Sequence, residues 1–265
     1  MSILSLIQVE DMLNYSDDAL IMAAVVAAGV GFLFLLQRVW RSELRRQYND
    51  LIGWHVGVLG SIYAVIIGFM LFAVWTNFAT AYTNADSEAN CLVDVARAAR
   101  GLPPASRDRV VQLLNEYVTA MLTKEWPAMN NDTVSSDSHA VIRQLWATLV
   151  HIEPHTRGEQ VSLDHTLTEL GKMTEFRRLR QLQVNAYLPG ILWFVLILGG
   201  ALTIMAACLF GASNFRLHLI QVIMLVLMIS SILVAIADIN HPFQGSLHVY
   251  PTSFERARDT LADLP

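Results

Sequence analysis

The sequence predicts an all-α membrane protein with four transmembrane helices and a helical extramembrane domain between the second and third. Apolar residues make up 54% of the 265-residue chain and charged residues only 15%, whereas soluble domains have about 25% charged residues. Four apolar segments reach the length that crosses a bilayer, and none carries Lys, Arg, Asp or Glu in its interior. The central region shows helical spacing of apolar residues and no alternating strand pattern.

The predicted spans follow directly from these apolar segments. They are Ala19–Leu36, about Val56–Thr80, Tyr187–Leu209 and Leu217–Ala237. A cleaved signal peptide is the alternative interpretation of the first segment, but the residues before it carry four carboxylates and neither Lys nor Arg. Because export signals need a positively charged start, we expect the first segment to remain as an anchor.

The spans divide the chain into five predicted parts. They are an N-terminal tail (1–18), spans one and two (19–83), a helical extramembrane domain (84–185), spans three and four (186–240) and a C-terminal tail (241–265). We expect the helix of span two to continue to the break at Gly101–Pro104, and a long helix from about Gly158 to run into span three. The turn after His241 is expected to fold the tail over the helical domain.

An even number of spans places both termini and the central region on one side of the membrane. Arginines near the membrane are almost evenly divided between the two sides, so the positive-inside rule leaves the orientation open. The acidic N-terminal tail, with Glu10, Asp11, Asp17 and Asp18, slightly favours an orientation with the termini outside.

The second span carries the strongest functional signal. Four polar residues follow one another at intervals of four, which stacks them on one face of a helix: Thr76, Thr80, Asn84 and Glu88. Polar groups at this depth are costly beside lipid, so we expect this polar stripe to face a watery path. Ile66, Phe69 and Phe72 precede it and predict an apolar constriction that gates by dewetting.

Two further expectations and one alternative concern the same span. A ring of Glu88 carboxylates at the mouth would favour cations. The small residues Gly57, Gly60, Ala64 and Gly68 have the spacing of close helix contacts. The alternative is that the phenylalanines pack between helices and the threonine hydroxyls bond back to their own helix.

A basic cluster lies just before span three, and an acidic residue closes span four. Arg177, Arg178 and Arg180 are predicted to lie at the membrane edge, where they pair with Asp238 or contact anionic lipid. Asp238 opposes the dipole at the end of its helix and therefore needs a partner or a watery setting.

Enzymatic, metal-binding and nucleic-acid-binding functions find no support. The chain has no HExxH, GxSxG, phosphate-loop or dinucleotide motif. His151 and His155 lie four residues apart, but Pro154 interrupts the helical face that a metal site would use. The net charge of −5 and the lack of a basic run argue against nucleic acid. We expect no cofactor, no metal and no enzyme activity.

Several landmarks resemble the bestrophin-like family of prokaryotic membrane proteins across residues 50–262. They are Gly60 to Phe69 (GSIYAVIIGF), Trp75, Glu88-Ala89, Tyr117, Glu125-Trp126-Pro127, Asp238, Pro242-Phe243-Gln244-Gly245, Pro251 and Phe254. The resemblance implies distant kinship with bestrophins, which are ligand-gated anion channels that form pentamers around a pore lined by the second span. It also implies a bacterial inner membrane location and a central domain on the inner side. The calcium-clasp acidic cluster of animal bestrophins is absent from this sequence.

Three functions remain open from the sequence. The first is a homo-oligomeric ion channel with a pore lined by span two, and its partners are lipids, other copies of the chain and the permeant ion. The second is a sensor or signal-relay protein whose helical domain binds a ligand or partner. The third is an accessory scaffold subunit of a membrane complex.

Overall fold

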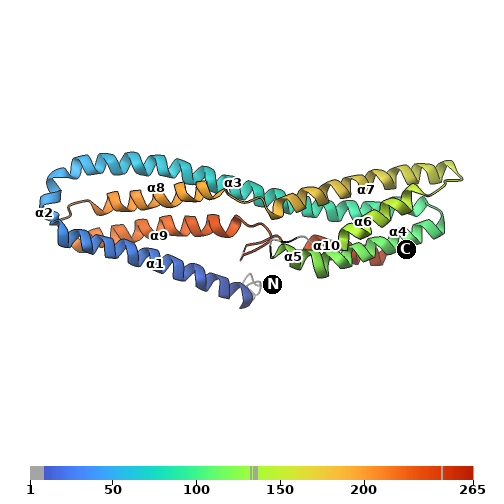
Figure 1. Ribbon diagram of the computed structural model, residues 1–265, viewed down its shortest axis with the longest axis horizontal. Coiled ribbons are helices and arrows are strands. Elements are labelled where there is room, and N and C mark those ends of the chain that lie inside the picture. Colours follow the sequence, from blue (N-terminus) through green and yellow to red (C-terminus); the bar gives the residue numbers. More distant parts are fainter. Residues whose placement is uncertain (1–8, 132, 134–136, 246, 265) are drawn as a thin grey trace. The chain divides into compact units, whose positions relative to one another are not determined.

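The computed structural model describes residues 9–131, 133, 137–245 and 247–264, with side chains from Asp18 onward. The chain divides into two compact units (Figure 1). Unit 1 holds the described residues up to Trp75 together with Tyr187–Asn240, and unit 2 holds Thr76–Ala186 and the described residues from His241. Every regular element among the described residues is a helix, which confirms the predicted all-α class.

Unit 1 contains four helices that are long and apolar enough to cross a membrane, which confirms the predicted spans. They are α1 (Val9–Val39), the N-terminal part of α3 (Asn49–Ala98), α8 (Gly190–Cys208) and α9 (Phe215–Ile239). The short helices α2 (Ser42–Arg45) and η2 (Arg46–Tyr48) connect α1 to α3. Figure 1 shows α1, α8 and α9 side by side. Residues 1–8 of the predicted tail lie outside the described residues, and from Val9 the tail is already helical.

The close contact between α3 and α8 in unit 1 involves glycines of α8 rather than those of α3. A Cβ atom built on Gly199 would lie 2.6 Å from Cδ2 of Tyr63, and one on Gly200 would lie 3.0 Å from its hydroxyl oxygen. The predicted close packing of Gly57, Gly60 and Gly68 is wrong within this chain, because a Cβ on any of them would meet nothing within 4 Å. The large side chain on α3 fits against the small residues on α8.

The two longest helices with residues in unit 2, α3 and α7, both stop at turns, but only α3 follows the predicted course. As predicted, α3 continues without a break to Ala98 and ends in the short helix η3 (Ala99–Gly101) before Pro103. The helix α7 (Arg157–Val184) starts at a capping box, in which Thr156 and Glu159 each accept a backbone hydrogen bond from the other. It does not run into span three, contrary to the prediction, because Pro189 restricts the residue before it and starts α8 afresh.

Unit 2 is a helical bundle around one apolar core. Its remaining elements are α4 (Pro104–Ala120), the π-helical turn η4 (Met121–Glu125), α5 (Trp126–Met129), α6 (Asp137–Val150) and α10 (Thr252–Asp263). Trp126 lies between Phe243 and Phe254 of the C-terminal segment, with both ring-centroid distances at 5.7 Å. Its indole N–H donates to the Val249 carbonyl at 3.2 Å. The tail therefore folds back onto the helical domain, as predicted.

Replacing Gly199 with Ala should destabilise unit 1, because the new methyl group would overlap the Tyr63 ring. Overpacking of this kind costs about 1–3 kcal/mol, which a thermal-unfolding experiment in mild detergent would show as a lower Tm. Gly68→Ala is the matched control, since its methyl group meets open space. A Gly199→Ala protein as stable as the control would contradict the close contact.

Candidate functional site

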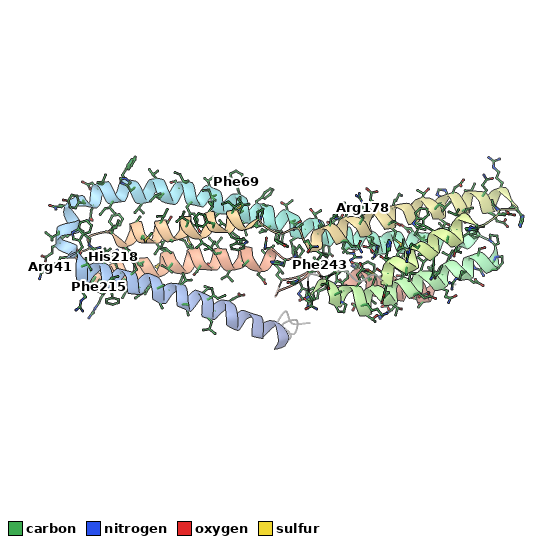
Figure 2. All side chains as sticks on the ribbon, viewed as in Figure 1. Arg41, Phe69, Arg178, Phe215, His218 and Phe243 are labelled. Atoms are coloured by element: carbon green, nitrogen blue, oxygen red, sulfur yellow. The ribbon has the colours of Figure 1, made fainter. Side chains whose placement is uncertain are left out.

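The phenylalanines predicted to form a constriction lie on the outer surface of α3. Phe69 and Phe72 are 66% and 68% exposed, whereas Ile66 is half-buried against the core that α3 shares with α8 and α9. Figure 2 shows Phe69 on the side of α3 that is turned away from α8. The structure thus brings Phe69 and Phe72 to one uncovered face and places Ile66 beside it.

The polar stripe on the unit 2 part of α3 divides into two pairs. Thr76 and Thr80 are exposed, whereas Asn84 and Glu88 are buried. The cause is helix geometry: residues four apart differ by about 40° around a helix of 3.6 residues per turn, so the stripe rotates by about 120° from first to last. A spacing of four over three turns therefore carries the stripe from the exposed face into the core.

The two pairs satisfy their polar groups in different ways. The Thr80 hydroxyl donates to the Thr76 carbonyl at 2.7 Å, which is the back-bonding that the sequence left open as an alternative. The Asn84 amide donates to Oε1 of Gln183 on α7 at 3.1 Å. The threonines leave hydroxyl oxygens at the surface, while Asn84 ties α3 to α7.

Glu88 belongs to a buried ionic network whose centre is Arg180 of α7. The Arg180 side chain is 0% exposed and donates from Nε to Oε2 of Glu88 at 2.7 Å and from Nη2 to Oε1 of Glu125 at 2.9 Å. Neither carboxylate is exposed. One guanidinium therefore joins α3, η4 and α7, and Glu88 does not present a free carboxylate to a pore mouth.

Neutral and charged neighbours complete this network. The Tyr117 hydroxyl of α4 donates to Oε1 of Glu88. Arg177 donates to Oε2 of Glu125 at 3.3 Å and to the Ser138 hydroxyl of α6 at 2.6 Å, and Ser138 in turn donates to Glu125. The network takes polar groups from α3, α4, η4, α6 and α7, so it fixes the mutual positions of these elements.

Burial and the neighbouring charges together set the protonation state of these groups. Burial would raise the pKa of Glu125, but the guanidinium groups of Arg180 and Arg177 outweigh burial and hold this pKa below its ordinary value. Burial, together with the charge of Glu88, raises the pKa of Tyr117 well above the usual value, so its hydroxyl stays a donor. Burial would lower the pKa of Arg180, yet the two carboxylates raise it, and the guanidinium stays charged.

The arginines of the predicted membrane-edge cluster therefore differ in their surroundings. Arg177 and Arg180 are buried and paired with Glu125 and Glu88, not with Asp238. Only Arg178 is exposed (Figure 2), and for it the ion pair or lipid contact stays a prediction. Asp238 lies half-buried near the end of α9 in unit 1.

Sequence reasoning missed the network, although the sequence held a signal for it. Apart from Gln183, the buried positions on α7 alternate at steps of three and four residues, which is the spacing of a helix core stripe: Leu163, Thr166, Leu170, Met173, Arg177, Arg180 and Val184. Arg177 and Arg180 occupy core positions of this stripe. Among the described residues no group of His, Cys, Asp or Glu side chains could hold a metal ion.

Replacing Glu125 with Gln should destabilise the protein strongly, because Arg177 and Arg180 would share too little negative charge in a buried site. Breaking a buried pair in this way costs about 3–5 kcal/mol. Thermal unfolding in mild detergent measures the effect, and Asp259→Asn is the control because its carboxylate pairs with Arg258 at the surface. Equal stability of the two variants would contradict a structural role for the network.

The unchanged protein and Glu125→Gln together test the pH dependence. Because the pKa of Glu125 in the folded state is depressed, its stabilisation is complete above its ordinary pKa of about 4.3 and is lost as the pH falls below that value. The Tm of the unchanged protein should therefore fall more steeply between pH 5 and pH 3.5 than that of Glu125→Gln. Parallel curves would show that Glu125 does not contribute.

Comparisons with known proteins assign the fold and the family. Two single-site variants of a bacterial bestrophin homologue from Klebsiella pneumoniae superpose with TM-scores of 0.71 and 0.69, at 11% and 12% identity, over 91% of this chain and 98% and 99% of theirs. A third structure of the homologue, phased from zinc, gives 0.63 at 13% identity over 91% of this chain and 97% of that chain. No curated protein sequence matches the chain.

The likeness to these solved structures is one of fold, since the identities are low. The sequence itself matches the family model of the bestrophin-like domain over residues 23–254, which takes in most of the first span, the other three spans and most of unit 2. The resemblance stated from the landmarks of the sequence is thereby confirmed. The chain belongs to the bestrophin-like domain family.

Proposed function

We propose that the chain assembles into a homo-oligomeric ion channel in the bacterial inner membrane, with α3 of each copy lining a central pore. Family membership and the shared fold with bacterial bestrophin homologues support a channel. The resemblance to bestrophins further supports a closed ring of five copies. In such a ring every copy contributes the same face of the same helix to the axis.

The observation that carries this proposal is the uncovered face of α3. Only 6% of its most apolar window is buried within the chain, compared with 22% for α8 and 28% for α9. Phe69 and Phe72 are bulky apolar residues exposed on its unit 1 part, and Thr76 and Thr80 are exposed on its unit 2 part. A face that changes from aromatic to hydroxyl-bearing residues suits a pore with an apolar constriction and a polar vestibule.

The buried network changes the expected ion preference. Glu88 alone argued for cations, but its carboxylate is enclosed and neutralised by Arg180. The threonine hydroxyls and the positive edges of phenylalanine rings are groups that can accompany an anion. We therefore propose anions as the permeant species, in keeping with the resemblance to bestrophins.

Replacing Phe69 or Phe72 with Ala should widen the constriction and raise ion flux on the order of tenfold, because a dewetted apolar gate opens when its bulk is removed. Flux through purified protein in liposomes measures the effect. Phe194→Ala is the matched control, since Phe194 is also 60% exposed but lies on α8. Unchanged flux in both α3 variants would remove these two residues from the gate.

The function as a whole is tested by current recordings in planar bilayers, with chloride, sulfate, sodium and potassium compared. We expect discrete currents carried by anions, from a protein that native mass spectrometry shows to be a ring of five. Glu88→Gln should leave the ion preference unchanged and lower only the stability. A silent dimer would exclude the channel and favour a sensor or scaffold, whereas cation currents would overturn the proposed selectivity.

A further inference from the structure

The helix α1 packs closely against α9 over only part of its length. A Cβ atom built on Gly29 would lie 3.0 Å from Cγ2 of Val226, and the rings of Phe34 and Phe215 meet edge to face with their centroids 5.3 Å apart. Leu33, which lies between these two contacts on α1, is 0% exposed. Figure 1 shows α1 drawing away from α9 toward its N-terminal end. The first half of this span therefore lies farther from α9 than the second half.

A groove of about 540 Å³ lies between α1, α8 and α9. Its wall on α1 is one face of the helix, because five of the lining residues recur at steps of three and four: Asp18, Ile21, Val25, Ala28 and Phe32. The opposite walls come from α8 and α9 and include the small residues Gly200, Ala201 and Ser230. The small side chains on these two helices leave the space open.

The groove is apolar along its length and polar at one end. Ser230 on α9 donates its hydroxyl hydrogen to the Leu227 carbonyl of the same helix at 3.1 Å. Trp193 lies near the start of α8 and carries an indole, the ring that is enriched at membrane interfaces. Asp18 is the only charged residue among the described lining residues, and it lies where the first candidate span begins. The polar end therefore lies at the edge of the membrane.

The dimensions of the groove decide which occupant fits. From Asp18 to Phe32 the groove follows α1 for about 21 Å, which is more than half of a bilayer hydrocarbon core of about 30 Å. Spread over that length, the volume of 540 Å³ gives a mean cross-section of roughly 26 Å². An α-helix with its side chains is about 10–12 Å wide and needs about 80 Å² or more. A helix of a second copy is therefore too wide, whereas a single hydrocarbon chain is narrow enough.

We propose that the groove holds one acyl chain of a phospholipid whose headgroup carries an amine, such as phosphatidylethanolamine. An acyl chain is the narrow apolar molecule that a bilayer supplies, and apolar walls take up apolar ligands rather than water. The Asp18 carboxylate attracts the ammonium group at the polar end and disfavours a headgroup that carries only negative charge. Because the groove is formed by α1, α8 and α9, this lipid site does not depend on the proposed pore face of α3.

The test uses the full-length protein purified in mild detergent, to which phosphatidylethanolamine or phosphatidylglycerol with the same acyl chains is added. We expect phosphatidylethanolamine to raise the Tm by about 5 °C and phosphatidylglycerol to raise it much less, as for a ligand well above its dissociation constant. Native mass spectrometry should show retained phosphatidylethanolamine. Glycerophosphoethanolamine, the same headgroup without acyl chains, should leave the Tm unchanged. An equal rise with it would overturn the acyl-chain site, and equal responses to the two lipids would overturn the amine headgroup.

Variants separate the groove from general contact with lipid. Ala28→Phe fills the groove from an exposed position and should abolish the response to phosphatidylethanolamine. Ala27→Phe adds the same ring at the neighbouring exposed residue, which does not line the groove, and should keep the response. If Ala28→Phe does not fold, Ala201→Phe fills the groove from an exposed position on α8.

Replacing Asp18 with Asn should make the responses to the two lipids equal, because it removes the charge that distinguishes their headgroups. A preference for phosphatidylethanolamine that persists in Asp18→Asn would overturn the proposal. An unchanged response in a folded groove-filling variant, or an equal loss in Ala27→Phe, would also overturn it.

Discussion

The buried guanidinium of Arg180 is the interaction on which unit 2 depends. It pairs with Glu88 on α3 and with Glu125 on η4, so that one side chain of α7 joins both elements. Three buried charges would be costly if any one were unpaired, since each has lost its water. Arg177, Tyr117 and Ser138 satisfy the remaining lone pairs, and this set of partners holds the helices in one arrangement.

The network also determines what α3 can offer to an ion. By drawing Glu88 and Asn84 into the core of unit 2, it leaves Thr76 and Thr80 as the exposed polar residues of the predicted stripe. The proposed pore face is therefore neutral and hydroxyl-bearing where the sequence suggested a carboxylate ring. A structural ion pair and a proposed selectivity thus follow from the same 50-residue helix, α3.

Arg45 in unit 1 is also a buried cation, but its hydrogen-bond partner is a backbone carbonyl rather than a carboxylate. Arg180 and Arg45 are both fully buried. Arg180 pairs with two carboxylates, whereas Nε and Nη2 of Arg45 have no hydrogen-bond partner among the described residues. This contrast is why we assign a structural role to Arg180.

The sequence by itself determined the class of the protein, its four spans, the unbroken course of α3 and the bestrophin-like family. Apolar length and helical spacing are local properties, so they can be read without knowledge of tertiary contacts. It could not assign the partners of Glu88, Arg177 and Arg180, nor the burial of Arg45. Charged side chains are buried only where a partner from a distant segment meets them, and such meetings depend on how the helices pack. The tertiary structure also decided which half of the polar stripe faces outward. A stripe with a period of four turns slowly around a helix of 3.6 residues per turn. Packing against the other helices of unit 2 then buries the half that reaches the core.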